Sequence, residues 1–545
     1  MKRWVFRILF CLLGVVVLLV AAGFIAKSFV SGSAKDSLVA SLGQQLGVPL
    51  SVGTVEFDLA EFVRLRPAVS LNNISIGNPA GFRAAPMVEA ERMYAQVRLL
   101  PLLKRRIEVH SLVIERPRVL VENNAQGVSN VEAFVKGIGG EKRPAETSPA
   151  TGAGKSSELA VEDFRIESGT ILLGGKRIAE DLNLRVRDFA ADRSARIELG
   201  TRLFGGANSR LNLDGHAGPF GAGALPLDGT LKLAIAPSEI PARMRQEQFG
   251  KLLGAPGSKA RATLQGTVKG DIYGSVGGPA KLTLSEIMIG RDDRHTLPLA
   301  GEVPLSFSAS KLMSAPSFNL KIPKGRLQLG TGEWSGDAEF QVRGPVLSGS
   351  SRGSIRNVDI NQMAGGFTTA DGKIYGVAEI PSYSVQFKGR NADEIRDSAT
   401  GGGKLMVSKG RIAAMDMLTS IQRALQQTQE TAAGETPFTS LASDLNLGQR
   451  RLDLSGVLLD SPLLRLTGSG AIGFDQALNF DLQARVTGAP ARLVNRLTRS
   501  GETDEALVPV KVAGTVNSPQ VRPDVKKLAT GAVEGLFKSL LKPKK

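Results

Sequence analysis

The sequence predicts a mainly β protein, in which one N-terminal transmembrane helix precedes an elongated antiparallel β-groove, a taco-like body with a few short helices. Three observations predict this fold class. An uncharged apolar run lies near the N-terminus, and apolar and polar side chains alternate with a period of two through most of the remaining chain. Turn residues are abundant, since the 545 residues include 62 glycines and 27 prolines.

The apolar run from Ile8 to Ala26 has the length of a membrane span. Its 19 residues carry no charge. At a rise of about 1.5 Å per residue they just cross a ~30 Å hydrocarbon core, so we expect a transmembrane helix over residues 8–30. Three basic side chains in residues 1–7 favour a cytoplasmic N-terminus, which places the body outside the cytoplasm.

A cleavable signal peptide is the alternative interpretation of the same segment. Small residues follow the apolar core at 21–23 and again at 31–34, as they do at cleavage sites. The run is longer than the apolar core of most signal peptides, which favours a retained anchor. Both interpretations export the body.

Composition narrows the functional classes. The formal net charge of +16 could suit nucleic acid, an anionic membrane or an acidic partner. Aromatic residues make up only 5% of the chain, and export separates the body from cytoplasmic nucleic acid, so we expect no nucleic-acid partner. The single cysteine, Cys11, lies in the apolar run, so the body has no disulfide and no thiolate metal site.

Changes in periodicity and composition divide the body. Residues 34–46 and 415–429 are expected to be helical. The stretch 136–158 is rich in Gly, Ala, Ser, Thr and Pro, which predicts a flexible linker. The resulting segments are an N-terminal β region at 31–135, the linker, a repetitive β region at 159–400, a C-terminal β region at 401–520 and a basic helix at 521–545.

Each alternating run predicts a strand with one apolar face, and a sheet must bury such a face. The chain has too few expected helices to cover all of the strands. Either two sheets face each other in a dry sandwich, or the apolar face lines a groove that is filled by an apolar ligand. The sequence leaves both open. For a groove, the expected lining residues are Phe164, Ile166, Leu231, Leu233, Leu452, Leu454, Phe480, Leu482, Val486, Val508 and Val510.

The sequence offers no constellation for catalysis, a cofactor or a metal. His110, His216 and His295 have no partner at metal-ligand spacing. The Gly-Ser-Ser-Arg-Gly stretch at 349–353 spells a nucleophile elbow but continues into a strand pattern, and no histidine follows it to complete a triad. The Gly-rich stretch 468–473 also lacks the helix that a dinucleotide site requires. We therefore expect a protein that is not an enzyme.

The C-terminal segment carries an amphipathic helix pattern. Six lysines crowd the remaining surface and the tail: Lys526, Lys527, Lys538, Lys542, Lys544 and Lys545. A basic helix of this kind can lie at a membrane interface or contact a partner, and it can equally close the end of the β-body. The expected contact residues are Leu536, Phe537, Leu540 and Leu541.

Several short motifs, in order, resemble the AsmA family of bacterial envelope proteins, which is related by fold to chorein-type lipid-transfer bridges. Near the N-terminus these are the anchor, LNNISIGNPAGF at 71–82 and LLPLL at 99–103. Near the C-terminus they are KGRI at 409–412 and VAGTV at 512–516. The middle of the chain matches only in its strand-and-turn character.

The resemblance implies a protein of the bacterial inner membrane, single-pass, with a periplasmic β-groove and a part in phospholipid transport or outer-membrane biogenesis. Its implied partners are membrane phospholipids and other envelope proteins. It supplies no catalytic residues. The alternative is a scaffold for outer-membrane proteins, with a dry β-sandwich body that carries no lipid and receives client strands at its sheet edges.

Overall fold

The computed structural model divides into two compact units. Unit 1 comprises Met1–Glu239, Thr263–Ala280 and Ser308–Pro316, and unit 2 comprises Ile240–Ala262, Lys281–Phe307 and Ser317–Lys545. The structure describes residues 39–40, 43–44, 47–58, 66–102, 107–124, 127–131, 133–134, 159–190, 192–219, 224–242, 259–290, 295–310, 317–367, 371–413, 415–425, 434–498 and 503–524.

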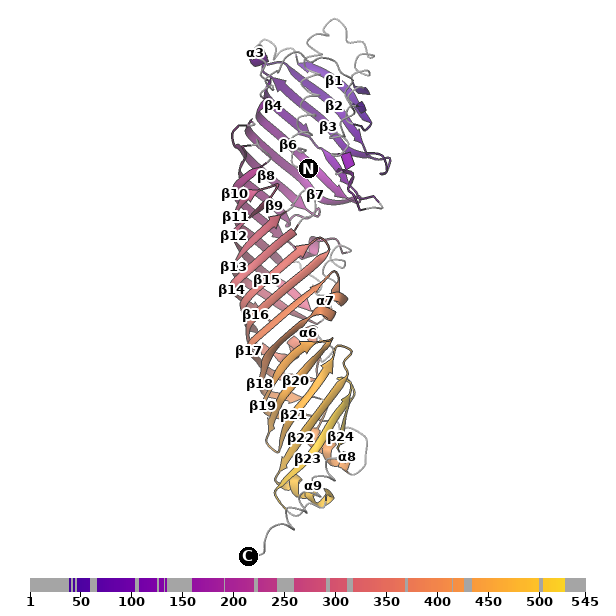
Figure 1. Ribbon diagram of the computed structural model, residues 1–545, viewed down its shortest axis with the longest axis vertical. Helices are drawn as coiled ribbons and strands as arrows, with labels where there is room; N and C mark the ends of the chain where they lie inside the picture. Colours follow the sequence, from indigo (N-terminus) through magenta and orange to yellow (C-terminus); the bar gives the residue numbers. More distant parts are fainter. Residues whose placement is uncertain are drawn as a thin grey trace, which may run out of the picture. The chain divides into compact units, whose positions relative to one another are not determined.

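The described chain is mainly β, as predicted. In unit 1 the strands from β1 to β10 lie side by side (Figure 1). Their bounds are β1 (Leu50–Asp58), β2 (Ala68–Gly77), β3 (Pro86–Val97), β4 (Ile107–Glu115), β5 (Arg118–Val121), β6 (Leu159–Leu173), β7 (Lys176–Ala190), β8 (Ala195–Leu203), β9 (Arg210–Ala217) and β10 (Pro226–Ile235). Three further strands contribute residues to both units: β11 (Arg261–Asp271), β12 (Ser275–Gly290) and β13 (Thr296–Ser310).

Unit 2 continues with an antiparallel meander in which each strand pairs with the next. Its strands are β14 (Ser317–Leu329), β15 (Gly332–Arg343), β16 (Val346–Asp359), β17 (Ile374–Gly389), β18 (Thr400–Ile412), β19 (Thr436–Gly448), β20 (Arg451–Ser461), β21 (Leu464–Gly473), β22 (Leu478–Thr487), β23 (Glu505–Gly514) and β24 (Pro519–Pro523).

The expectation of a purely antiparallel sheet is wrong at one place in unit 1. Strand β6 pairs parallel with β4 and with β5. Residues 122–158 separate β5 from β6, and a connection of that length lets the chain return to the same end of the sheet before the next strand begins. The linker predicted at 136–158 is part of this connection and lies outside the described residues.

The 71–82 motif has a local structural role in unit 1. Asn78, at the end of β2, donates from its amide nitrogen to the carbonyl oxygens of Arg83 and Ala85, at 3.1 and 3.0 Å, which closes the following turn. Asn130 has no exposed surface and donates to the side-chain oxygen of Asn78 at 2.8 Å and to the carbonyl oxygen of Leu120 at 2.7 Å. The motif therefore ties this turn to the end of β5.

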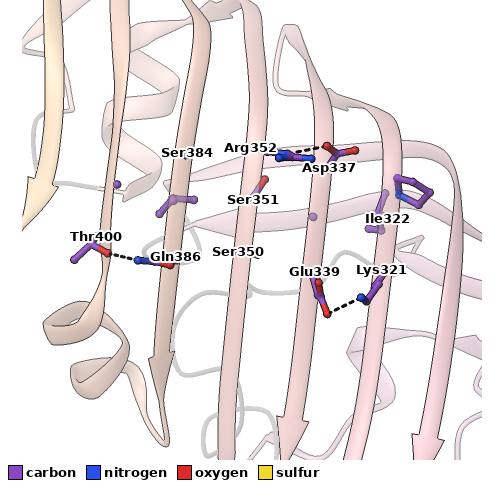
Figure 2. Close-up of a pocket in the computed structure, with 14 residues that line it drawn as sticks. Lys321, Ile322, Asp337, Glu339, Ser350, Ser351, Arg352, Ser384, Gln386 and Thr400 are labelled. Carbon is purple, nitrogen blue, oxygen red and sulfur yellow. Dashed lines mark hydrogen bonds and ion pairs between the residues drawn. The ribbon is translucent and has the colours of Figure 1, made fainter.

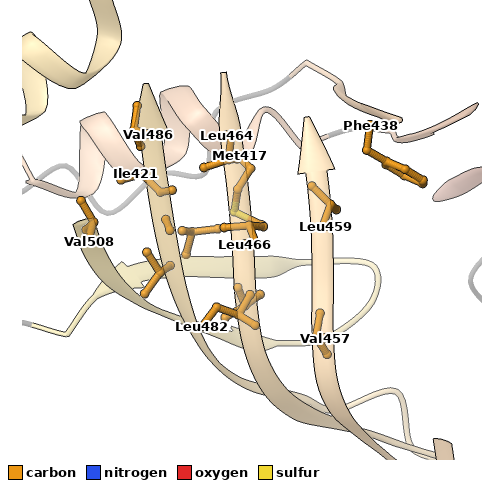
Figure 3. Packing of buried hydrophobic residues seen from close by; sticks show 14 of the residues in the cluster. Met417, Ile421, Phe438, Val457, Leu459, Leu464, Leu466, Leu482, Val486 and Val508 are labelled. Atoms are coloured by element: carbon orange, nitrogen blue, oxygen red, sulfur yellow. The ribbon is translucent and has the colours of Figure 1, made fainter. Parts of the chain in front are cut away.

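Helices cover part of one sheet face in unit 2. They are α6 (Ile360–Phe367), α7 (Ala392–Ser398), α8 (Met417–Leu425) and α9 (Ala489–Thr498), and a short α3 (Leu99–Leu102) lies in unit 1. Met417 and Ile421 of α8 are 3% and 1% exposed, and they belong to the same buried cluster as Leu466 and Val486 of the neighbouring strands (Figure 3). This cluster is the main core of unit 2.

The helix predicted at 415–429 is confirmed as α8 from 417 to 425, whereas Met415 and Asp416 precede the helix, and α6, α7 and α9 were not predicted. Two of them carry signals that could have revealed them. Asn391 caps α7 by accepting a hydrogen bond from the backbone nitrogen of Glu394, a capping-box spacing. In α9, Pro490 lies in the first turn, and Ala491 and Val494 form a buried stripe.

The remaining terminal expectations fall outside the described residues. These are the transmembrane helix at 8–30 and most of the basic helix at 521–545, with its contact residues Leu536, Phe537, Leu540 and Leu541. The predicted start of the basic helix is wrong, because residues 521–523 belong to β24. The helix predicted at 34–46 is described at only four of its positions. Within the described part of the chain, no helix combines the length and apolar character needed to span a bilayer.

Candidate functional site

Strand register in unit 1 gathers apolar side chains on one face. Residues directly opposite each other in paired strands point to the same side of a sheet, so a chain of such pairs defines a row across the strands. One such row crosses nine strands without a polar side chain. Its members, in order, are Val55, Leu71, Met93, Ile114, Ile166, Leu184, Leu199, Leu213 and Leu231.

Burial along this row is uneven. Leu71 and Met93 are 3% and 5% exposed, whereas the side chains from Ile114 to Leu231 are only half-buried. Half-buried apolar side chains still expose part of their surface to solvent. The later strands of unit 1 therefore carry an apolar strip that the described part of the unit leaves partly uncovered.

Unit 2 repeats the arrangement with a covered row and two open rows. The covered row has residues between 0% and 2% exposed, except for the half-buried Leu441, and α6, α8 and α9 contribute to the same core cluster. We name this set the covered row: Val358, Ala378, Val407, Leu441, Leu459, Leu466, Ala484 and Val508.

The two rows beside it cross the seven strands β16 to β22 and are half-buried throughout. We name them the open rows. The first contains Ser351, Val385, Gly401, Leu447, Leu452, Ile472 and Leu478, and the second contains Gly353, Tyr383, Gly403, Leu445, Leu454, Gly470 and Phe480. With neighbouring strands about 4.8 Å apart, six spacings give a strip about 29 Å long.

The glycines in the open rows make room for aromatic rings. A Cβ added at Gly470 would lie 2.2 Å from a ring carbon of Phe480, directly opposite, and one at Gly349, which lies beside the open rows, would lie 2.4 Å from the ring of Phe387, directly opposite. Each ring therefore occupies the space that a side chain at the opposite glycine would fill, and it covers backbone that would otherwise be bare.

The reverse face of the same strands is polar and carries a hollow of about 580 Å³ over β14 to β18 (Figure 2). Lys321 and Glu339, opposite each other, form an ion pair at 3.3 Å, and Arg352 pairs with Asp337 at 2.9 Å. The backbone N–H of Lys324 and the Arg352 guanidinium lower the pKa of Asp337. These charges are satisfied within the protein, and the lining contains neither histidine nor cysteine.

Two of the histidines contact carboxylates of the same unit. The ring nitrogen Nδ1 of His110 lies 2.6 Å from a carboxylate oxygen of Glu162, and Nε2 of His295 lies 3.1 Å from Asp371. No group of three or more potential metal ligands occurs among the residues that the structure describes. The 349–353 stretch lies inside β16, as its strand pattern predicted.

All eleven residues expected to line a groove lie on the apolar faces, but their burial separates them. Ile166, Leu231, Leu233, Leu452, Leu454 and Phe480 are half-buried and partly accessible. Phe164, Leu482, Val486, Val508 and Val510 are between 0% and 9% exposed, and the last four belong to the core of unit 2. Sequence alternation identifies the face, whereas the position of the covering helices decides which part of it stays open.

The open rows present apolar surface along their length, with no charged side chain at an inward position. Covering apolar surface stabilises a complex by about 0.8 kcal/mol for each CH₂ group removed from water. The strip is long and has no charged side chain at its inward positions, so it suits an extended hydrocarbon better than a compact polar molecule.

The comparisons with known proteins agree with the motifs. No curated protein and no solved structure matches the chain. The model of the AsmA family matches residues 1–236, a range that includes the described strands β1 to β10 of unit 1 and the turn held by Asn78 and Asn130. Over residues 1–236, the chain is therefore similar to the AsmA family.

Proposed function

We propose that this chain is a protein of the bacterial inner membrane, anchored by residues 8–30, whose periplasmic apolar faces bind the acyl chains of phospholipids. In this role it serves phospholipid transport or outer-membrane biogenesis and performs no catalysis. The observation that carries the proposal is the pair of open rows, which run across seven neighbouring strands without a charged inward side chain.

The partial exposure of these rows favours a groove over a dry sandwich. In a sandwich, the inner faces of both sheets interdigitate and their side chains are buried. Here Leu452, Leu454, Ile472 and Leu478 remain half-buried while the adjacent covered row is closed by helices. A lipid chain over the open rows would complete the burial that the helices begin.

The edge strand at the C-terminal end of the meander does not favour the alternative role, a scaffold that receives client strands. Among the described strands, β24 pairs only with β23 and so offers a free edge. It is five residues long and has proline at both ends, Pro519 and Pro523. A short edge strand that contains proline disfavours pairing with a strand from another chain.

Lipid analysis of the purified full-length chain tests the proposal. We expect phospholipid to remain bound after gentle detergent extraction and gel filtration, in excess of the amount retained by a variant with charged residues in the open rows. Mass spectrometry of the extracted lipid gives its amount and class. Equal, near-zero lipid in both proteins would refute the proposal and favour a body that carries no lipid.

A further inference from the structure

A hydrogen-bonded polar cluster interrupts the open rows of unit 2. It joins Trp334 of β15, Ser351 of β16 and Tyr383 of β17, which the strand register places on the inward face. Trp334 Nε1 donates to Tyr383 Oη, and Ser351 Oγ lies 2.6 Å from the same Tyr383 Oη. All three side chains are half-buried, so the cluster meets solvent on the side of the open rows.

The other inward hydroxyl groups in this part of unit 2 are already used by the protein. Thr436 Oγ1 donates to the carbonyl oxygen of Met415 and accepts from the backbone nitrogen of Met417, each at 2.8 Å. Ser443 Oγ donates to the carbonyl oxygen of Ser455 at 3.1 Å and is 2% exposed. Both groups serve local structure and do not face the open rows.

The number of hydrogens in the cluster determines whether a hydrogen-bond donor remains for a ligand. The serine and tyrosine hydroxyls carry one hydrogen each, and the indole N–H of Trp334 is committed to Tyr383 Oη. One hydrogen joins the two hydroxyls. If Ser351 donates it, the Tyr383 hydrogen is left over, and if Tyr383 donates it, the Ser351 hydrogen is left over. In either case one donor is available for an acceptor from outside the protein.

The surroundings indicate the chemistry of that acceptor. The inward positions of the open rows carry no Lys or Arg, so a phosphate would have no cation to balance its charge there. The neighbouring inward positions are Gly336, Gly353 and Gly403, which place no side chain beside the hydroxyls. A neutral carbonyl oxygen attached to hydrocarbon fits this environment, and tryptophan and tyrosine favour places where apolar and polar groups meet.

We propose that the Trp334–Tyr383–Ser351 cluster binds the ester carbonyl of an acyl lipid whose hydrocarbon lies along the open rows. This inference rests on the proposed function. The cluster fixes where the junction between the polar and apolar parts of the lipid sits on the strip, and it favours ester-linked over ether-linked lipid.

A competition between two lipids tests the inference. The full-length chain in detergent is equilibrated with equal amounts of a diacyl phosphatidylglycerol and its dialkyl ether analogue, which have the same headgroup and chain length. Bound lipid is then measured by mass spectrometry after gel filtration. We expect the ester lipid to be retained in about two- to tenfold excess, which is the range expected for one hydrogen bond.

The variants follow from the hydrogen count. Tyr383→Phe and Ser351→Ala each leave one hydroxyl, so each single variant should keep the preference. The triple variant W334F/Y383F/S351A has no hydrogen-bond donor at the cluster, because Trp334→Phe also removes the indole N–H that loss of the Tyr383 hydroxyl would free. It should retain the two lipids equally, with binding of the ether lipid unchanged, and unchanged ether binding also shows that the triple variant is folded. Ser354→Ala, on the reverse face of β16, is the matched control and should keep the preference.

The other outcomes are distinguishable. Equal retention of both lipids by the unmodified chain overturns this inference and leaves the proposed function standing, whereas no retention of either lipid overturns both. An unchanged preference in the triple variant also overturns the assignment of the cluster. Loss of both lipids to the same extent in a triple variant that keeps its far-ultraviolet circular dichroism would place the contact at a group that the two lipids share and overturn the assignment to the ester.

Discussion

Val486→Asp is expected to unfold the C-terminal part of unit 2. Val486 has no exposed surface, and it faces Leu464 and Ala506 in the paired strands beneath the helices. A carboxylate there has no hydrogen-bond partner among these apolar neighbours and must be desolvated or protonated. The expected loss in the free energy of unfolding is about 4 kcal/mol or more.

The measurement is denaturant unfolding followed by far-ultraviolet circular dichroism on the full-length chain. The matched control is Gln483→Asp, three positions away on the exposed face of the same strand, which is expected to change stability by less than about 0.5 kcal/mol. Equal unfolding midpoints for the two variants would contradict the covered core formed by α8, α9 and the strands.

The double variant Leu452→Asp/Leu478→Asp is expected to lower phospholipid retention by about tenfold or more while leaving unit 2 folded. Both residues are half-buried in the first open row, where a carboxylate can stay hydrated as long as the strip is empty. Hydrocarbon laid over them must remove that water, and a loss of only 1.4 kcal/mol in binding already gives a factor of ten.

The control adds the same charge to the opposite face. Thr467→Asp/Asn479→Asp changes exposed, outward residues of β21 and β22 and should retain lipid like the unmodified chain. Lipid retention is measured as phosphorus per protein after gel filtration, and circular dichroism checks folding. Similar losses in both double variants would show that net charge, rather than the open rows, governs retention.

The sequence predicts individual strands better than their assembly. Alternation at 478–486 and 508–512 is confirmed by β22 and β23, because one apolar face and one wet face leave a clear period of two. Bulges hide the pattern elsewhere. Lys409, with φ of 50°, lies at an irregularity in β18. Beyond such an irregularity, the alternation of inward and outward side chains shifts by one residue. In the paired strand β19, Phe438 and Leu441 therefore share one face although they are three residues apart.

The candidate site depends on contacts that the alternation of apolar and polar residues in the sequence does not reveal. The open and covered rows differ only in whether α6, α8 and α9 pack over them, and sequence analysis identified one of these three helices. The polar cluster unites Trp334, Ser351 and Tyr383 from three strands, and only the strand register shows that they meet. The parallel pairing of β6 with β4 likewise depends on the end of the sheet to which the connection between β5 and β6 returns. The composition of that connection does not specify this end.

Site-specific photo-crosslinking tests the central claim most directly. A benzophenone side chain is placed at Leu452, Leu478 or Phe480 on the open rows, and at Asp453, Asn479 or Asp481, the outward neighbours on the same strands. After irradiation of membranes that contain the full-length chain, mass spectrometry of the purified protein detects covalent phospholipid adducts. A lipid-binding groove predicts adducts at the three inward positions and few or none at the outward ones. Equal yields on both faces, or no adduct at the inward positions, would contradict it.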